Sequence, residues 1–225
     1  MPTIQLVKPT TEPVSLAEAK LHLRLETAFT DDDAKVTQLI TIARKAAEEY
    51  TRRSLITQQW RLVLDQFPAP GMNIGSANWY GPQYGISPGP MTTLRPEGTT
   101  GFEIFLDHGP IQSVESVTYT DPDGATQTLQ SSQYKLDTIT EPSRIVPAYG
   151  TTWPGIRNEI NAVSVSYTAG YGDASTVPDE IKGWMLLRIG AMYENREEIV
   201  VGSRLASVDL PFVDGLLRPY RVLSY

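Results

Sequence analysis

The spacing of hydrophobic residues changes twice along this chain of 225 residues. Near both ends they recur every three or four residues, which is typical of one face of an α-helix, whereas in the middle they alternate, as in a β-strand. The helical spacing predicts four helices, at residues 15–24, 31–53, 178–198 and 211–217. Neither end alone can cover its own apolar faces, so we expect both ends to pack into one antiparallel helical unit.

The first two predicted helices carry the clearest signals. Ser15-Leu16-Ala17-Glu18 has the pattern of a capping box, in which Ser15 and Glu18 satisfy each other's backbone amides at a helix start. The second helix opens with three aspartates at 31–33 and closes with Arg52 and Arg53, charges that suit the two ends of the helix dipole. Its apolar stripe consists of Val36, Leu39, Ile40, Ala43, Ala46, Ala47 and Tyr50.

The middle of the chain predicts short strands. Alternation begins at Trp60, Leu62 and Leu64, and further strands are expected at 102–106, 116–120, 125–129, 134–137, 144–146 and 162–168. The tight-turn sequence at 121–124 predicts an antiparallel hairpin. The predicted fold class is therefore α+β, with a discontinuous helical domain (1–56 and 169–225) and an inserted small antiparallel β-sandwich or barrel (57–168).

Residues 71–101 predict a long loop inside the β insertion. They contain seven glycines and four prolines, with Trp79, Tyr80 and Tyr84 among them. Aromatic side chains bring a large contact area at a low cost in conformational entropy, which suits contact with a partner. The alternative is that the loop packs on its own sheet.

Composition excludes several classes of function. A net charge of −7 offers no basic surface for gripping nucleic-acid phosphates. The absence of cysteine excludes disulfides, thiolate catalysis and cysteine-based zinc sites. No apolar run reaches the roughly 18 residues of a membrane span and no export signal is present, so we expect no membrane partner.

The polar residues do not predict a catalytic, cofactor or metal site. His22 and His108 are the only histidines and lie in separate predicted elements. The aspartates at 31–33 suit a helix start better than a metal site, because adjacent side chains on a helix point in different directions. We therefore expect a protein that is not an enzyme.

Several short motifs, taken in order, resemble one family of proteins. They lie at residues 12–24, 31–32, 50–60, 109–114, 144–147, 163–173, 177–178, 193–197 and 216–221. Together they are similar to the head-tail connector, or adaptor, proteins of long-tailed bacteriophages, in that family's larger branch with a β insertion. The chain departs from this pattern at 71–101, where the family passes more directly to the next strand.

The resemblance implies a structural protein of the virion neck that is assembled in the host cytoplasm. Such proteins form a homo-oligomeric ring, usually a dodecamer, beneath the portal protein, and they provide the platform for a stopper or tail-terminator protein. Double-stranded DNA passes through the ring without specific binding, which suits a net-acidic chain because fixed positive charges would hold phosphates. Two alternatives stay open: a virion-associated β module that recognises a carbohydrate or host surface, and a hydrolase that uses carboxylates alone.

Two sets of residues follow as candidate contact sites. The polar faces of the second and third long helices are expected to form the ring interface, through Arg44, Glu48, Arg52, Arg188, Glu194 and Arg196. The C-terminal segment is expected to bind the portal, through Arg218, Pro219, Tyr220, Arg221, Val222, Leu223 and Tyr225. It is predicted to be extended, without an intramolecular partner; the alternative is that it folds back across its own helices.

Overall fold

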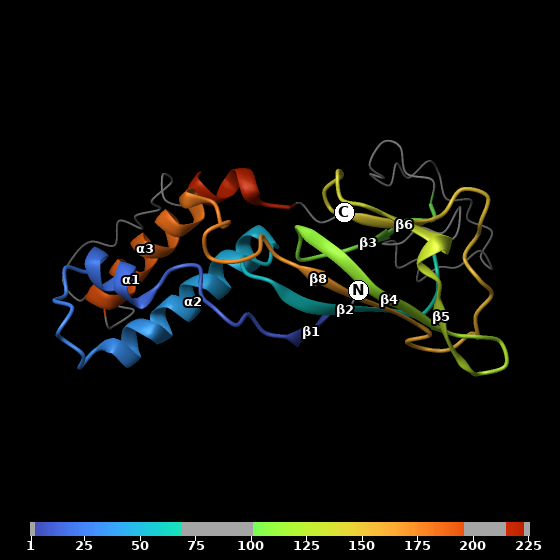
Figure 1. The fold of residues 1–225 in the computed structure, drawn as a ribbon, viewed down its shortest axis with the longest axis horizontal. Coiled ribbons are helices and arrows are strands. Elements are labelled where there is room, and N and C mark those ends of the chain that lie inside the picture. Colours follow the sequence, from blue (N-terminus) through green and yellow to red (C-terminus); the bar gives the residue numbers. More distant parts are fainter. Residues whose placement is uncertain (1–2, 69–100, 196–214, 223–225) are drawn as a thin grey trace, which may run out of the picture.

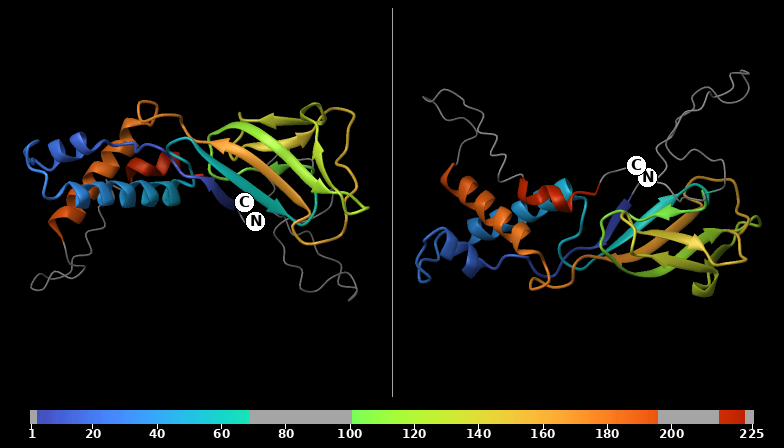
Figure 2. Two further views of the ribbon diagram at one scale, coloured as in Figure 1. Left: turned by 60° about the horizontal axis from the view of Figure 1, so that its bottom comes forward. Right: turned by 90° about the horizontal axis from the view of Figure 1, so that it is seen from above.

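The computed structural model describes residues 3–68, 101–195 and 215–222. The helices gather at one end of an elongated molecule and the sheets at the other (Figure 1). Further views from below and above keep these two parts apart, so the division does not depend on the direction of view (Figure 2). The predicted α+β fold class is confirmed.

The helical unit is formed by both ends of the described chain. Helices α1 (Leu16–His22) and α2 (Asp33–Thr51) come from the N-terminal part. Helix α3 (Asp179–Glu194) comes from the C-terminal part, as do helical residues 215–217, which continue into the 3-10 turn η3 (Arg218–Tyr220). Side chains from both parts share one hydrophobic core, to which α2 contributes Ile40 and α3 contributes Met185.

The starts of α1 and α2 differ in their capping. The capping box of α1 is present, because the amide of Glu18 donates to Ser15 Oγ at 3.2 Å and the amide of Ser15 donates to the Glu18 carboxylate at 2.7 Å. Asp32 is the N-cap of α2 but makes no capping hydrogen bond with its side chain. Instead its carboxylate accepts from the Tyr193 hydroxyl at 2.5 Å, and Asp33 pairs with Lys20 at 2.8 Å. Asp32 and Asp33 thus connect the start of α2 to α3 and α1, respectively.

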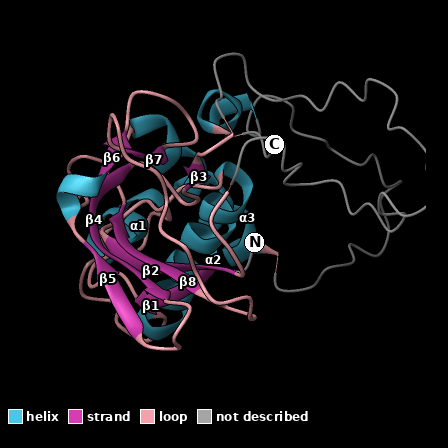
Figure 3. Ribbon diagram, turned by 90° about the vertical axis from the view of Figure 1, so that its right-hand side faces the viewer, coloured by secondary structure: helices cyan, strands magenta, loops and turns pink. Residues whose placement is uncertain are grey.

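The β part contains two antiparallel sheets. The larger has the order β1-β2-β8-β4-β5, and the smaller has the order β3-β7-β6. Their bounds are β1 (Thr3–Val7), β2 (Gln58–Leu64), β3 (Ile104–Phe105), β4 (Ile111–Thr120), β5 (Thr126–Leu129), β6 (Tyr134–Asp137), β7 (Arg144–Pro147) and β8 (Val163–Ala169). Seen along the long axis, the strands lie in front of the helices (Figure 3).

The two sheets share a second core, so they form a small sandwich. Leu62, Val117 and Val165 of the larger sheet are fully buried together with Ile104 and Ile145 of the smaller one. The alternation predicted from Trp60 follows from this packing, since every second residue of β2 turns towards the core. The predicted hairpin is confirmed: β4 pairs with β5 in antiparallel register across residues 121–124.

Strand β1 corrects one sequence-based assignment. Residues 3–7 were grouped with the helical unit, but they pair with β2 at the edge of the larger sheet, with Ile4 opposite Arg61. The five residues are too few to show a period, and their partner strand lies more than fifty residues further along the chain. Long-range pairing of this kind leaves no local signal in the sequence.

Candidate functional site

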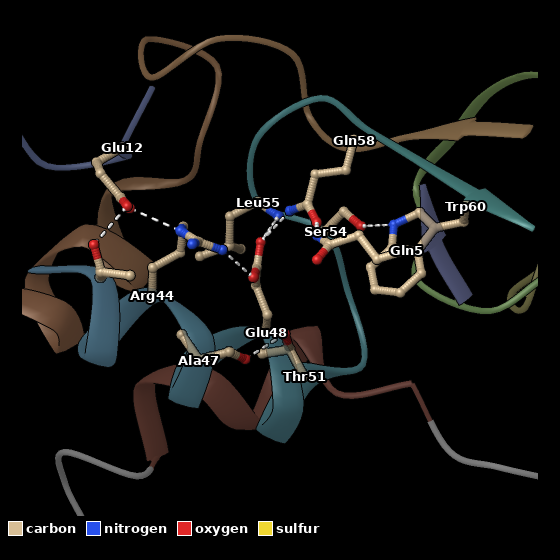
Figure 4. Close-up of polar contacts among 11 residues, drawn as sticks. Gln5, Glu12, Arg44, Ala47, Glu48, Thr51, Ser54, Leu55, Gln58 and Trp60 are labelled. Carbon is tan, nitrogen blue, oxygen red and sulfur yellow. Dashed lines mark hydrogen bonds and ion pairs between the residues drawn. The ribbon is translucent and has the colours of Figure 1, made fainter. Parts of the chain in front are cut away.

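A chain of polar contacts connects the helical unit to the larger sheet. Its centre is Glu48 on α2 (Figure 4). One carboxylate oxygen of Glu48 accepts from the Leu55 amide at 3.0 Å and from Gln58 Nε2 at 2.5 Å, and the other accepts from Arg44 Nη1 at 2.5 Å. Since Gln58 belongs to β2, this carboxylate bridges a helix and a strand.

The chain of contacts continues in both directions. Arg44 Nε donates to Glu12 at 2.7 Å, which connects α2 to the segment before α1, and Thr41 Oγ1 donates to the same carboxylate at 2.9 Å. At the other end, Gln5 Nε2 of β1 donates to Gln58 Oε1 at 2.5 Å. The two Glu12 contacts hold the segment before α1 against α2, and the Gln5 contact holds β1 against β2. The bond between Glu48 and Gln58 is the one in this chain of contacts that joins α2 to the sheet.

Burial controls the electrostatics of this junction. Arg44 is only 5% exposed. Burial raises the pKa of Glu48 above its usual value, although the Arg44 guanidinium and three hydrogen bonds act in the opposite direction. Arg44 and Glu48, which the sequence places in the ring interface, are thus paired inside their own subunit, and Arg44 has little exposed surface for such a contact. In the sequence, Arg44 and Glu48 have the i,i+4 spacing of an exposed ion pair. Only their contacts with Glu12 and Gln58, which are remote in the sequence, show that the pair lies inside the subunit.

A second polar cluster lies around Arg53, at the end of the helical unit. Its Nε donates to the Tyr220 carbonyl at 2.6 Å, its Nη1 donates to Glu141 at 2.7 Å, and its Nη2 contacts the other oxygen of Glu141. Arg53 is buried. Glu141 lies between β6 and β7, so this one side chain contacts both the C-terminal segment and the smaller sheet's loop.

The C-terminal segment folds back on its own helices. The Tyr220 hydroxyl donates to Glu180 at 2.9 Å, and the Val222 amide donates to the Thr51 carbonyl at 3.0 Å. The Arg221 guanidinium lies 5.5 Å from the centre of the Tyr50 ring. The prediction of an extended segment without a partner is therefore wrong for residues 218–222, and the alternative conformation is observed; Leu223 and Tyr225 lie outside the described residues.

The other predicted contact residues have different surroundings. Arg52, Arg188 and Glu194 are exposed. Arg52 is the C-cap of α2 with a positive φ of 56°, and the Arg188 guanidinium lies 5.8 Å from the Trp184 ring centre. Arg196 and the aromatic residues Trp79, Tyr80 and Tyr84 lie outside the described residues.

The two histidines lie apart and have different surroundings. His108 stacks on Trp60 with ring centres 3.8 Å apart, and burial lowers its pKa. His22 lies against Gly190 of α3. Within residues 3–68, 101–195 and 215–222, no three His, Cys, Asp or Glu residues group as metal ligands would. In those ranges, no helix combines the length and the apolar character that crossing a membrane requires.

The N-terminal part of the chain is similar in sequence to a known family of proteins. Residues 13–73, which include α1, α2 and β2, match the family described as phage gp6-like head-tail connector protein. The resemblance to head-tail connectors is confirmed. No curated protein sequence matches the chain.

Several solved structures contain a chain with the same fold as this protein. A chain in the neck of an empty gene transfer agent (GTA) particle, computed with C6 symmetry, has a TM-score of 0.70 and 20% identity. A chain in the virion of a native GTA particle has a TM-score of 0.67 and 20% identity. A chain in the neck of a native GTA particle, computed with C12 symmetry, has a TM-score of 0.67 and 18% identity. Each comparison covers 100% of this chain and 97% of the other.

The family match supports a structural connector role. The structural matches extend the shared fold to the whole chain, including the β sandwich and the C-terminal segment beyond residue 73. They also come from particles whose necks were treated with sixfold and twelvefold symmetry.

Proposed function

We propose that this chain is the adaptor subunit of a phage-like virion neck. It forms a twelve-membered homo-oligomeric ring beneath the portal protein, extends the DNA exit channel, and provides the platform for a stopper or tail-terminator protein. The observation that carries the proposal is the similarity of the entire chain to neck subunits of symmetric particles, together with the connector match over residues 13–73. No chemistry is required of the subunit.

The charge of the protein suits this role. With 26 acidic residues against 19 Lys and Arg, the chain has a net charge of −7. A wall of this sign repels phosphates, so DNA can pass without being held by fixed cations. We propose that double-stranded DNA is cargo of the channel and not a ligand.

The subunit is proposed to use separate surfaces for its different partners. Arg52, Arg188 and Glu194 remain as candidates for the helical part of the ring interface, because all three are exposed. The portal-binding role is proposed for the C-terminal segment, where Arg218 and Arg221 are exposed on a segment that already packs on the subunit. In the proposed division, the helical domain is discontinuous and the β domain is inserted into it.

Electron microscopy of the purified chain mixed with its cognate portal protein tests this function. The expected result is an additional annular layer at the exit end of the portal, with the portal's own rotational symmetry. The variant Arg52→Glu/Arg188→Glu should lose this layer and keep its circular dichroism spectrum, because both side chains are exposed. A wild-type chain that adds no layer to the portal contradicts the proposed function.

A further inference from the structure

Strand β1 is an edge strand, and no described strand pairs with its outer side. It lies at one end of the larger sheet, and Thr3–Val7 contains no charged residue. Ile4, Leu6 and Val7 are 52%, 42% and 45% exposed. Soluble proteins normally protect such an edge with a charge, a proline or a bulge, because unpaired backbone groups beside apolar side chains recruit another strand. In β1 the register with β2 shifts between Gln5 and Val7, and Lys8 and Pro9 follow the strand, so its regular part is Thr3, Ile4 and Gln5.

The opposite edge of the same sheet has matching properties. Strand β5 (Thr126–Leu129) is also uncharged, and its first three residues are exposed. The smaller sheet offers poorer partners, since edge strand β6 carries Lys135 and Asp137 and edge strand β3 has only two residues. Among the described strands, β5 is therefore the best match to β1 in length and charge.

The directions of these two strands suit a ring. Four successive antiparallel pairings separate β1 from β5, so the two strands run in the same direction at opposite edges of the sheet. A head-to-tail ring requires two different surfaces on opposite sides of the subunit. Edges β1 and β5 meet this requirement.

We propose that β1 of one subunit pairs in parallel with β5 of the next copy, so that the sheet continues from subunit to subunit. The inference rests on the proposed function, because it requires a ring. Backbone hydrogen bonds provide the contact, as in other cases of strand addition. A parallel pair of four or five residues is a weaker contact than a long antiparallel one, so it supplements the helical interface.

The strand register identifies side chains that would meet across this contact. Ile4 and Thr128 lie on the same face of the sheet, the face opposite the sandwich core. Ile4 pairs with Arg61 and Arg61 pairs with Ser166. Ser164, two residues from Ser166 on β8 and so on the same face, pairs with Thr118, which pairs with Thr128. Thr126 lies two residues before Thr128 and shares this face. Cysteines at these positions would point to one side, as a disulfide between neighbouring strands requires.

The absence of cysteine makes cross-linking a clean test. Rings of Ile4→Cys/Thr128→Cys, and of Ile4→Cys/Thr126→Cys to cover a second register, are assembled on the portal and oxidised mildly. At least one pair should give a ladder of covalent oligomers on a denaturing gel, whereas each single variant should stop at the dimer or stay monomeric. The control Ile139→Cys/Thr128→Cys should give no ladder, because Ile139 is 94% exposed but lies outside both edge strands.

A charge at the edge provides a second test. Ile4→Lys/Leu6→Lys should lower the fraction of subunits assembled on the portal, while Ile139→Lys should leave it unchanged. Circular dichroism checks that both variants are folded. The inference is overturned if complete rings give no ladder with either cysteine pair, or if Ile4→Lys/Leu6→Lys assembles fully. Either result leaves the connector role intact. A wild-type chain that forms no ring on the portal contradicts the connector role itself.

Discussion

Removal of the Arg44 charge should destabilise the protein strongly, although sequence reasoning placed this residue on a free surface. In Arg44→Met, methionine substitutes for the apolar part of the arginine side chain. Glu48 and Glu12 lose the guanidinium, which contacts them at 2.5 and 2.7 Å, respectively. Glu48 is then a largely buried carboxylate, 14% exposed, without a cationic partner. Removing one member of a buried ion pair costs about 3–5 kcal/mol. We therefore expect the free energy of unfolding to fall by about 3 kcal/mol or more.

The measurement is chemical denaturation followed by circular dichroism, supported by thermal melting. For a chain of this size, a loss of about 3 kcal/mol corresponds to a decrease in Tm of roughly 6–12 °C. Lys45→Met is the matched control, because Lys45 is the next residue on α2 and is exposed. It should change stability by no more than about 0.5 kcal/mol.

The double variant Arg44→Met/Glu48→Leu separates the charge from the packing. It removes both members of the pair and should recover part of the stability lost in Arg44→Met, because no uncompensated carboxylate remains. A loss below about 1 kcal/mol in Arg44→Met, comparable to that of a surface change, would refute the argument that burial makes this pair essential.

Three further predictions concern other parts of the molecule. Burial raises the pKa of Glu48 in the folded protein above its unfolded value near 4.5, so the folded state binds this proton more tightly. The wild type should therefore lose stability relative to Glu48→Gln as the pH rises above about 4.5. Denaturation midpoints of the two proteins that run parallel from about pH 4 to 7 would contradict this. Deletion of residues 219–225 should cost more than about 1 kcal/mol in denaturation, because it removes the Tyr220 and Val222 contacts; an unchanged midpoint would show that the segment contributes nothing to the fold. Gly183→Ala should stabilise the protein by about 1 kcal/mol and raise its Tm, since the added Cβ meets open space. Gly170→Ala should lower the Tm, since φ is +128° and the new Cβ would lie 2.4 Å from the backbone oxygen of Ile56. A higher Tm for Gly170→Ala than for Gly183→Ala would refute this argument.

Local patterns predicted the elements that depend on local physics. The stripe on α2, the capping box at Ser15 and the hairpin at 121–124 depend on residues within a few positions of one another, so their signals are visible in the sequence. The prediction that the chain ends share a core is confirmed because each helix has an apolar face that nothing nearby could cover.

The polar sites depended on partners far along the chain. Arg44 meets Glu12, and Arg53 meets both Glu141 and the carbonyl of Tyr220, at sequence separations of 32, 88 and 167 residues. A local pattern cannot show such pairs, so charged helix positions were interpreted as exposed. The C-terminal segment was interpreted as unpartnered for the same reason, since its acceptor is the Thr51 carbonyl at the end of α2. One signal was available: Arg53 follows the last turn of α2 directly, where a cation can reach several backbone carbonyls.

The position of Arg53 has a mechanical consequence. One planar guanidinium contacts the C-terminal segment through Nε and the loop between β6 and β7 through its two terminal nitrogens. A force that pulls residue 220 away must either break its bond to Arg53 or move the side chain that also holds Glu141. Tension on the end of the chain is therefore transmitted to the smaller sheet of the sandwich through a single side chain, and the two ends of this elongated subunit are not free to respond independently.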